Sequence, residues 1–274
     1  TILSACSDES LAEECLRAIT EGSAIFSVAG CGSSGAWDLP PEVQAVFVDQ
    51  SWLLTGTADF VSYAAVANQC LVYANVDGGK GVFLVDMNEN GIALTPHNTD
   101  DATIRLSSMS LDAVVARQVA GVGEEVMEEA LQVALVALAG EQVGAARRIF
   151  EITIEYLKTR HQFGQPIGSF QALKHIAADL LIELESASSA AQHAARAIAA
   201  GSDERKLMSC LAGFTCADNY RKITADAIQL HGGIAYTMEH PAHLFWRRAQ
   251  TGQWLYCSSD TLRDNYLAEM EKML

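Results

Sequence analysis

One segment of the chain combines residue types that can hold a phosphate group. It reads Arg160-His-Gln-Phe-Gly-Gln-Pro-Ile-Gly-Ser-Phe-Gln-Ala-Leu-Lys-His175 and joins two expected helices. An arginine at a helix end beside a glycine-containing turn can hold a diphosphate through two parallel hydrogen bonds. Gln171 follows in the next expected helix, in reach of the same ligand. On physics alone, a solvated arginine and a packing phenylalanine remain the simpler explanation.

A second segment places paired glycines at the end of another expected helix. It reads Gln229-Leu-His-Gly-Gly-Ile-Ala-Tyr-Thr-Met-Glu-His-Pro241. Because glycine has no Cβ, Gly232 and Gly233 let a ligand or a neighbouring backbone approach closely. An ordinary helix cap explains the pair equally well, so both interpretations stay open.

The histidines and cysteines do not predict a metal centre. His231, His240 and His243 lie close together in the sequence, but Pro241 interrupts the short pair and no carboxylate stands at a usual ligand spacing. The seven cysteines form no Cys-x-x-Cys pair, so neither a zinc ribbon nor a disulfide framework is indicated. We expect reduced thiols that pack as small hydrophobic residues.

Long helices must position the two segments. From residue 123 to 274, Ala, Leu, Glu and Arg dominate and internal turn signals are few. Apolar periodicity predicts helices over 124–158, 169–200, 203–230, 239–248 and 258–272. Short loops between helices of this length favour an antiparallel four-helix-type bundle, and the broad Ala-rich faces argue against a coiled coil. We expect the long helices also to bury apolar faces against other protomers.

The region before the bundle has the character of a β-domain. Between residues 24 and 122, short β-branched or aromatic runs alternate with Gly, Pro, Asn and Asp, which predicts antiparallel strands in a sandwich or barrel. Residues 8–21 carry a helical apolar stripe behind an acidic first turn, and Gly22 ends it. The predicted organisation is therefore 1–23, 24–122 and 123–274, an α+β fold.

Composition restricts the class of protein. The chain has 274 residues, 50% hydrophobic and 19% charged, which fits a globular protein with a full core. Its net charge of −16 argues against a nucleic-acid partner, because phosphate contact needs clustered basic residues. No window approaches the roughly 18 to 20 apolar residues of a membrane span, and no leader segment is recognisable. We expect a soluble, cytoplasmic protein that contacts no membrane.

The two segments, in this order, resemble the acyl-CoA dehydrogenase family. Its signature is an Arg-x-x-Phe-Gly turn, a later Gln and a Gln-x-x-Gly-Gly loop, matched here by Arg160, Phe163, Gly164, Gln171, Gln229, Gly232 and Gly233. The resemblance covers nearly the whole chain and implies a helical domain, a central β-domain and a C-terminal bundle. Residues 1–23 are then a remnant of the N-terminal helical domain. Residues 53–67 are similar to the strand pair that backs the flavin ring.

The resemblance implies FAD shared at a subunit interface. In the family, these side chains grip the diphosphate and adenosine end of an FAD whose isoalloxazine lies in the neighbouring protomer. The implied cofactor contacts are Arg160, Gln162, Phe163, Gln171, Gln229, Gly232, Gly233 and Ser258. The ring side departs from the family, because residues 28–36 lack the Glu-Pro of its Thr-Glu-Pro-x-x-Gly-Ser-Asp loop. Phe60, Val61 and Ser62 remain candidates to back a flavin ring.

The catalytic base of the family is missing. Dehydrogenation at Cα–Cβ of a thioester needs a carboxylate that takes the α-proton while hydride leaves to the flavin. The two positions at which the family places this Glu hold Tyr256 and Ala134. A tyrosine, with a pKa near about 10, is a poor base at neutral pH. Glu141 lies on the same helix face as Ala134 but about 10 Å along the axis, so we expect no catalytic residue in this chain.

These departures predict a non-catalytic subunit of a hetero-oligomeric acyl-CoA dehydrogenase. The chain resembles the smaller partner of actinobacterial α2β2 heterotetramers that oxidise the side chains of steroid-CoA thioesters in cholesterol catabolism. Its expected partners are a catalytic subunit that supplies the Glu, an acyl-CoA substrate and an electron-transfer acceptor. Two alternatives stay open: a self-sufficient homotetramer with a displaced base, and a flavin-free scaffold on the same fold.

Overall fold

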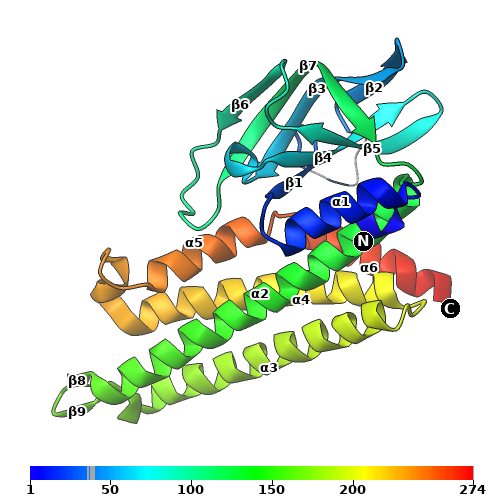
Figure 1. The fold of residues 1–274 in the computed structure, drawn as a ribbon. Coiled ribbons are helices and arrows are strands. Elements are labelled where there is room, and N and C mark those ends of the chain that lie inside the picture. Colours follow the sequence, from blue (N-terminus) through cyan, green and yellow to red (C-terminus); the bar gives the residue numbers. More distant parts are fainter. Residues whose placement is uncertain (36, 38–40, 274) are drawn as a thin grey trace. The chain divides into compact units, whose positions relative to one another are not determined.

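The short β-branched and aromatic runs become the strands of one closed sheet. In the computed structural model, which describes residues 1–35, 37 and 41–273, this sheet belongs to a unit over Thr1–Leu131. The strands are β1 (Phe26–Ala29), β2 (Val43–Val48), β3 (Ser51–Ser62), β4 (Gln69–Val76), β5 (Gly79–Asp86), β6 (Ile92–Pro96) and β7 (Leu106–Gln118). Their order is β1-β4-β2-β3-β7-β5, and pairing of β4 with β5 closes the barrel (Figure 1).

Pairing in the barrel is mainly antiparallel, as predicted, but β4 has two parallel neighbours. Strand β1 runs parallel to β4, with Phe26 opposite Gln69, and β2 makes one parallel contact with β4. Strand β1 follows a helix rather than a hairpin, so its direction is not set by a tight turn. The barrel core is filled by inward-facing residues of alternate positions, among them Leu54, Phe83 and Met109, none of which is exposed.

One helix covers the first part of this unit. A short 3-10 turn, η1 (Leu3–Ala5), precedes helix α1 (Glu9–Thr20), and a further turn, η2 (Ala64–Val66), follows β3. Asp8 caps α1, since its Oδ1 accepts a hydrogen bond from the Leu11 amide at 3.0 Å. Leu11 and Cys15 face inward and pack with Tyr73 and Val82 of the sheet.

The second unit, Gln132–Leu274, is the predicted helical bundle. Its elements are most of α2 (Glu124–Thr159), β8 (His161–Gln162), β9 (Gln165–Pro166), η3 (Ile167–Ser169), α3 (Gln171–Ala199), α4 (Arg205–His231), η4 (Gly232–Tyr236), α5 (Ala242–Gly252) and α6 (Ser259–Met273). Helix α4 packs against α3, α5 and α6 (Figure 1). No helix in the described part of the chain is long and apolar enough to cross a membrane.

Small side chains let the long helices approach closely. Ala187, Ala191 and Ala194 of α3 pack with Ala212 and Cys216 of α4, all of them buried within the chain. The Ala-rich stripes are therefore used inside the bundle. The apolar side chains that α3 leaves exposed are Leu181 and Ile182, which are 45% and 68% exposed, and contact of this face with other protomers stays a prediction.

Candidate functional site

The Arg-x-x-Phe-Gly segment forms a strained hairpin turn after α2. Strands β8 and β9 are joined by two residues, Phe163 with φ 53° and Gly164 with φ 80°. A two-residue turn with both φ values positive is usually built from Asn-Gly, because a side chain larger than Asn is strained in this region. Phe163 is nevertheless 90% exposed and touches only the edge of the Phe170 ring, with ring centroids 6.1 Å apart.

Arg160 is placed by the end of α2. Its backbone N–H donates to the Tyr156 carbonyl at 2.8 Å, and its own carbonyl accepts from Ile167 at 2.8 Å. A Cβ on Gly168 would lie 2.8 Å from the Leu157 carbonyl oxygen, so this glycine allows the turn to close on α2. The Arg160 side chain is exposed and forms no ion pair within the described ranges. Its guanidinium is therefore available to an external anion.

The two glutamines of the first segment flank this turn. Gln171 is the first residue of α3 and is exposed, at the helix end where backbone N–H groups favour an anion. Gln162 is also exposed, and its Nε2 donates to the His161 carbonyl at 2.9 Å. Arg160 and Phe163 thus lie in the short connection between α2 and α3, and Gln171 begins the next helix, as the sequence predicts.

The Gly-Gly loop ends α4 with a conformation that only glycine adopts easily. Gly232 has φ 65° and ψ −145°, and its N–H donates to the carbonyls of Ile228 and Gln229. Gly233 has no positive φ, and a Cβ built on it would meet nothing within 4 Å. Packing within the chain therefore does not require glycine at 233. Both glycines and Gln229 are exposed.

A stack of aromatic rings brings the two segments to the same end of the bundle. The Tyr156 ring lies 4.6 Å from the His231 ring, which lies 4.3 Å from His240. We call these three residues the histidine stack. His231 Nδ1 is 2.7 Å from the Ala227 carbonyl and donates to it as N–H. In Figure 1 the β8–β9 hairpin, the start of α3 and the end of α4 share one end of the bundle.

The histidine stack was missed in the sequence. Burial lowers the pKa of His231, and the neighbouring His240 lowers it further, while the hydrogen bond to Ala227 opposes both. Burial also lowers the pKa of His240, with a contribution from His243. His231 and His240 stand at the two ends of the Gly-Gly loop, so their contact pins the loop. Within the described ranges no three His, Cys, Asp or Glu side chains are grouped as metal ligands.

Tyr256 is one of the two positions at which the sequence comparison expects the base. It lies in the connection between α5 and α6 and packs against a buried cluster that includes Leu135 of α2 and Leu262 of α6. Burial raises the pKa of Tyr256, and the charge of Glu141 raises it further against the opposing charge of Arg248. The phenol therefore stays protonated at neutral pH.

The carboxylate next to this cluster is held by a cation. Glu141 Oε1 accepts from Nε of Arg248 at 2.7 Å, and Nη2 lies at the same distance. The Arg248 side chain is only 17% exposed, so this pair is partly desolvated. A carboxylate engaged in this way is poorly disposed to take the proton from the α-carbon of a thioester. Ser258, expected as a cofactor contact, caps α6 by accepting from the Thr261 amide at 3.1 Å.

In the first unit, Phe60 stands at a bulge of β3. The β3–β7 register shifts between Ala58 and Val61, and Phe60 adopts φ 54°. The His97 ring stacks on Phe60 with centroids 5.0 Å apart and an interplanar angle of 9°. A Cβ on Gly35 would lie 3.2 Å from the same ring. His97 and Gly35 therefore both lie near the Phe60 ring, although the residue stays 39% exposed.

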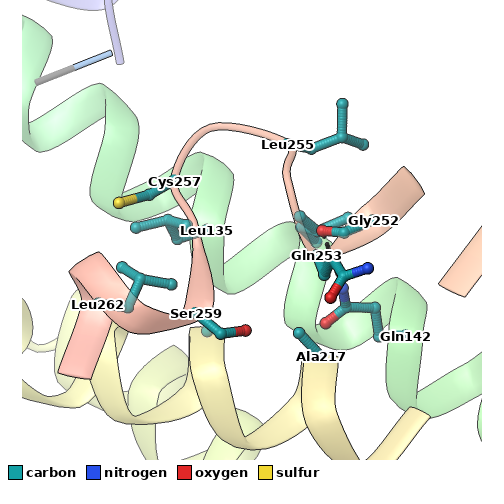
Figure 2. Close-up of a pocket in the computed structure, with 11 residues that line it drawn as sticks. Leu135, Gln142, Ala217, Gly252, Gln253, Leu255, Cys257, Ser259 and Leu262 are labelled. Atoms are coloured by element: carbon teal, nitrogen blue, oxygen red, sulfur yellow. Dashed lines mark hydrogen bonds between the residues drawn. The ribbon is translucent and has the colours of Figure 1, made fainter. Parts of the chain in front are cut away.

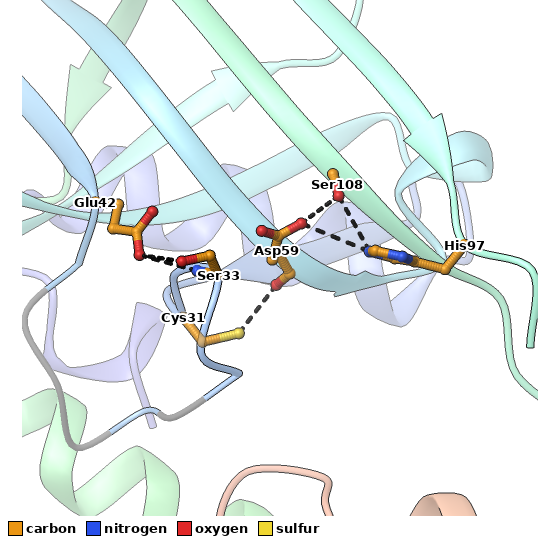
Figure 3. A network of polar contacts seen from close by, with 6 residues as sticks. All are labelled: Cys31, Ser33, Glu42, Asp59, His97 and Ser108. Atoms are coloured by element: carbon orange, nitrogen blue, oxygen red, sulfur yellow. Dashed lines mark hydrogen bonds and ion pairs between the residues drawn. The ribbon is translucent and has the colours of Figure 1, made fainter.

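A polar network holds the His97 ring that stacks on Phe60, and Figure 3 shows His97 with its partners Asp59 and Ser108. His97 Nε2 lies 3.1 Å from Ser108 Oγ and 3.6 Å from Asp59 Oδ1, and Ser108 donates to Asp59. Both partners face the same ring nitrogen, so Asp59 does not orient the imidazole from its far side as a catalytic triad requires. The network is a support for the ring stack. Val61 is buried, and the Ser62 carbonyl accepts from Ser27 Oγ at 2.7 Å.

The loop that replaces the family's Thr-Glu-Pro motif folds on itself. Ser33 donates to Glu42 Oε1 from its N–H at 3.0 Å and from its hydroxyl at 2.8 Å. A Cβ on Gly32 would meet the Glu42 side chain, which would have to shift. The Cys31 thiol donates to the Asp59 carbonyl at 2.9 Å, which ties the loop to the β3 bulge (Figure 3). The end of the motif, Ala36, lies outside the described residues.

Comparison with known families now identifies the class of protein. Residues 121–270, more than half of the chain, match the family described as acyl-CoA dehydrogenase, C-terminal domain. The chain belongs to the acyl-CoA dehydrogenase family, whose members use FAD. The resemblance predicted from the two motif segments is confirmed, and so is the fold of a β-domain followed by a helical bundle.

Individual relatives and structures extend this result. The chain is 41% identical over 131 residues to acyl-CoA dehydrogenase IpdE2 of Mycobacterium tuberculosis, covering 47% of this chain and 39% of the relative. It therefore spans about two fifths of the length of that relative. A crystal structure of the ChsE4-ChsE5 complex from the same species aligns with a TM-score of 0.90 at 27% identity, covering 99% of this chain and 73% of that one. The Tcur3481-Tcur3483 steroid acyl-CoA dehydrogenase G363A variant aligns at 27% identity with a TM-score of 0.85, covering 96% and 71%.

Proposed function

We propose that this chain is a subunit of a flavin-dependent acyl-CoA dehydrogenase that completes the FAD site of a partner and does not supply the catalytic base. One observation carries this proposal. The binding turn around Arg160 is intact and open, whereas both base positions, Tyr256 and Ala134, lack a carboxylate.

The residues at the end of the bundle fit the nucleotide end of FAD. The exposed Arg160 guanidinium and the N-terminus of α3 suit a diphosphate. The exposed Phe163 ring suits a planar adenine or an apolar surface of a partner. Gly233 has open space around its Cα, as expected where a ligand or a partner backbone lies against it. These are the same residues that the family resemblance assigns to the cofactor.

The β-domain supports a flavin ring held chiefly by the partner. A flavin that stacked on Phe60 from the His97 side would have to displace His97, which Ser108 and Asp59 hold in place. Gly35 also lies near this ring, since a Cβ built on it would be 3.2 Å from Phe60. We therefore propose that this chain binds the diphosphate and adenosine end of FAD through Arg160 and that the partner binds the isoalloxazine ring.

This assignment divides the chemistry between two subunits. When bound, FAD accepts the hydride from Cβ of the acyl thioester. This chain orients the cofactor by holding its diphosphate, while the partner's carboxylate takes the α-proton. At neutral pH the Tyr256 phenol stays protonated, and Glu141 is engaged by Arg248. Neither residue is therefore assigned a part in the proton transfer.

The solved relatives suggest the substrate and the assembly. One is a complex of two differently named chains, and another is named as a steroid acyl-CoA dehydrogenase. We propose an α2β2 heterotetramer that oxidises the side chain of a steroid-CoA thioester and passes the electrons to an electron-transfer acceptor. A homotetramer that uses Glu141 as a displaced base is disfavoured by the Arg248–Glu141 ion pair.

Co-expression tests the proposal. The chain is produced alone and together with a partner chain that has an intact Thr-Glu-Pro-x-x-Gly-Ser-Asp loop and a Glu at either base position. We expect flavin absorbance and acyl-CoA turnover in the complex and neither in the chain alone. Turnover by the chain alone would establish the self-sufficient enzyme instead.

A matched pair of arginine variants tests the cofactor grip within that complex. Arg160→Ala is expected to lower the flavin retained after gel filtration. Arg148→Ala is the control, because Arg148 lies on α2, the helix that precedes Arg160, is 65% exposed and pairs with Glu151 one turn away. Equal flavin content in the two variants would defeat the assignment of Arg160 and favour a flavin-free scaffold role for this chain.

A further inference from the structure

A small pocket lies inside the bundle beneath the connection that carries Tyr256 (Figure 2). Its cavity volume is about 10 Å³, close to the room that one water molecule needs. It is lined by Leu135, Leu138 and Gln142 of α2, Gly213 and Ala217 of α4, Gly252 of α5, Gln253, Leu255 and Cys257 of the connection, and Ser259 and Leu262 of α6. All these residues belong to the second unit.

Two polar atoms of this pocket are buried without a hydrogen-bond partner in the described part of the chain. They are Oε1 of Gln142 and Oγ of Ser259. Gln142 as a whole is only 3% exposed, and its Nε2 is engaged with the Gly252 carbonyl at 3.4 Å. In Figure 2 the Ser259 hydroxyl points toward the side of the pocket where Gln142 lies. A buried polar atom without a partner is costly, so the pocket favours a ligand that satisfies both.

We propose that this pocket is a binding site for one water molecule that bridges Gln142 and Ser259. The amide oxygen of Gln142 can only accept, so the ligand must donate to it. The Ser259 hydroxyl can donate or accept, which suits the second hydrogen or a lone pair of the same molecule. Most of the remaining wall is apolar and includes Leu135, Leu138 and Leu262, and no charged side chain of the described residues lines the pocket, so a charged ligand would lose its hydration without compensation. A neutral donor of this size is water.

The bridge fixes the start of α6 to the middle of α2. The connection between Gly252 and Ser259, which carries Tyr256, is then held at both ends through Gln142: directly at the Gly252 carbonyl and through the water at Ser259. Position 252 favours glycine, because a Cβ there would lie 3.1 Å from Gln142 Nε2. Gln142 is thus a positioning residue for this connection, whichever function the connection serves.

A crystal structure of the full chain, or of its complex, at a resolution that shows ordered water tests the site directly. We expect one peak within hydrogen-bond distance of both Gln142 Oε1 and Ser259 Oγ. A dry pocket, or two polar atoms that turn to bond each other directly, would overturn the proposal.

A double-mutant cycle tests the same bridge in solution. Gln142→Met and Ser259→Ala each remove one partner of the water, so the double variant is expected to be more stable than the sum of single effects predicts, by about 3-fold or more in the unfolding equilibrium constant. The control pairs Gln142→Met with Ser258→Ala, whose hydroxyl caps α6 and does not line the pocket. That pair should be additive. Additivity of the Ser259 pair as well would refute the bridge.

Discussion

Lowering the pH is expected to loosen the loop that holds Gly232 and Gly233. The histidine stack connects the two ends of this loop. His231 precedes the loop and His240 follows it, and their ring centroids lie 4.3 Å apart. Burial lowers the pKa of both histidines, and each carries a further lowering from a neighbouring histidine, His240 for His231 and His243 for His240. Both rings are therefore held neutral in the folded chain.

The sign of the effect follows from these lowered pKa values. Above about pH 6.5, the ordinary pKa of histidine, His231 and His240 are neutral in the folded and the unfolded chain. Their titration therefore takes nothing from the free energy of unfolding in this range. As the pH falls below this value, the unfolded chain binds protons that the folded chain does not. The free energy of unfolding then decreases, by up to about 1.4 kcal/mol per pH unit for the buried His231 and by less for the partly exposed His240, until the pH passes below the folded pKa.

Urea unfolding at a series of pH values measures this slope. His231→Phe keeps a ring in the stack and cannot titrate, so it should remove up to about 1.4 kcal/mol per pH unit from the slope. His175→Gln, at an exposed position on α3, is the control and should leave the slope unchanged. The carboxylates of Asp8 and Glu269 have lowered pKa values and titrate below this window. A slope that is the same in wild type and His231→Phe would refute the role of the stack.

Four substitutions test other parts of the structure. Tyr256→Phe should leave acyl-CoA turnover of the complex unchanged, and a loss of orders of magnitude would make Tyr256 the base after all. Ser258→Ala removes the cap of α6 and should cost about 1 kcal/mol in urea unfolding, whereas no loss would contradict the cap. Gly168→Ala places a Cβ 2.8 Å from the Leu157 carbonyl oxygen and should cost about 1 to 3 kcal/mol in the same assay; an unchanged midpoint would show that the turn can shift. Phe163→Asn should stabilise the chain alone by about 1 kcal/mol, since Asn adopts a left-handed turn at lower cost, yet lower the flavin retained by the complex; flavin retention equal to wild type would remove Phe163 from the site.

Much of the fold could be predicted because each element has a strong local signal. The long helices carry apolar periodicity over many turns, and their predicted limits differ from the structure by few residues, as for 169–200 against α3, Gln171–Ala199. The exception is the helix predicted at 239–248, which begins only at Ala242. There Pro241 is suited to the start of a helix and cannot continue one, and the preceding residues form the end of the Gly-Gly loop.

What the sequence did not reveal depends on contacts between distant residues. Gln142 and Ser259 share a pocket although 117 positions separate them, and neither has a motif around it. The Glu141–Arg248 pair is equally remote, and only the packing of α5 against the bundle brings the two charges together. The His97–Phe60 stack needs the β3 bulge, and no single residue type in the sequence predicts that bulge. Side chains that meet through tertiary packing have no periodic signature in one sequence.

The Phe163 turn argues for an external binding surface independently of any resemblance. A phenylalanine held at φ 53° stores about 1 to 3 kcal/mol of strain. Inside the chain its ring gains little in return, because it is 90% exposed and meets only the edge of Phe170. Burying a phenylalanine side chain fully releases about 1.5 to 3 kcal/mol, which is the same size as the strain. Covering the tip with a ligand or with another protein would therefore offset a strain of this size, and Arg160 beside it favours a cover that carries negative charge.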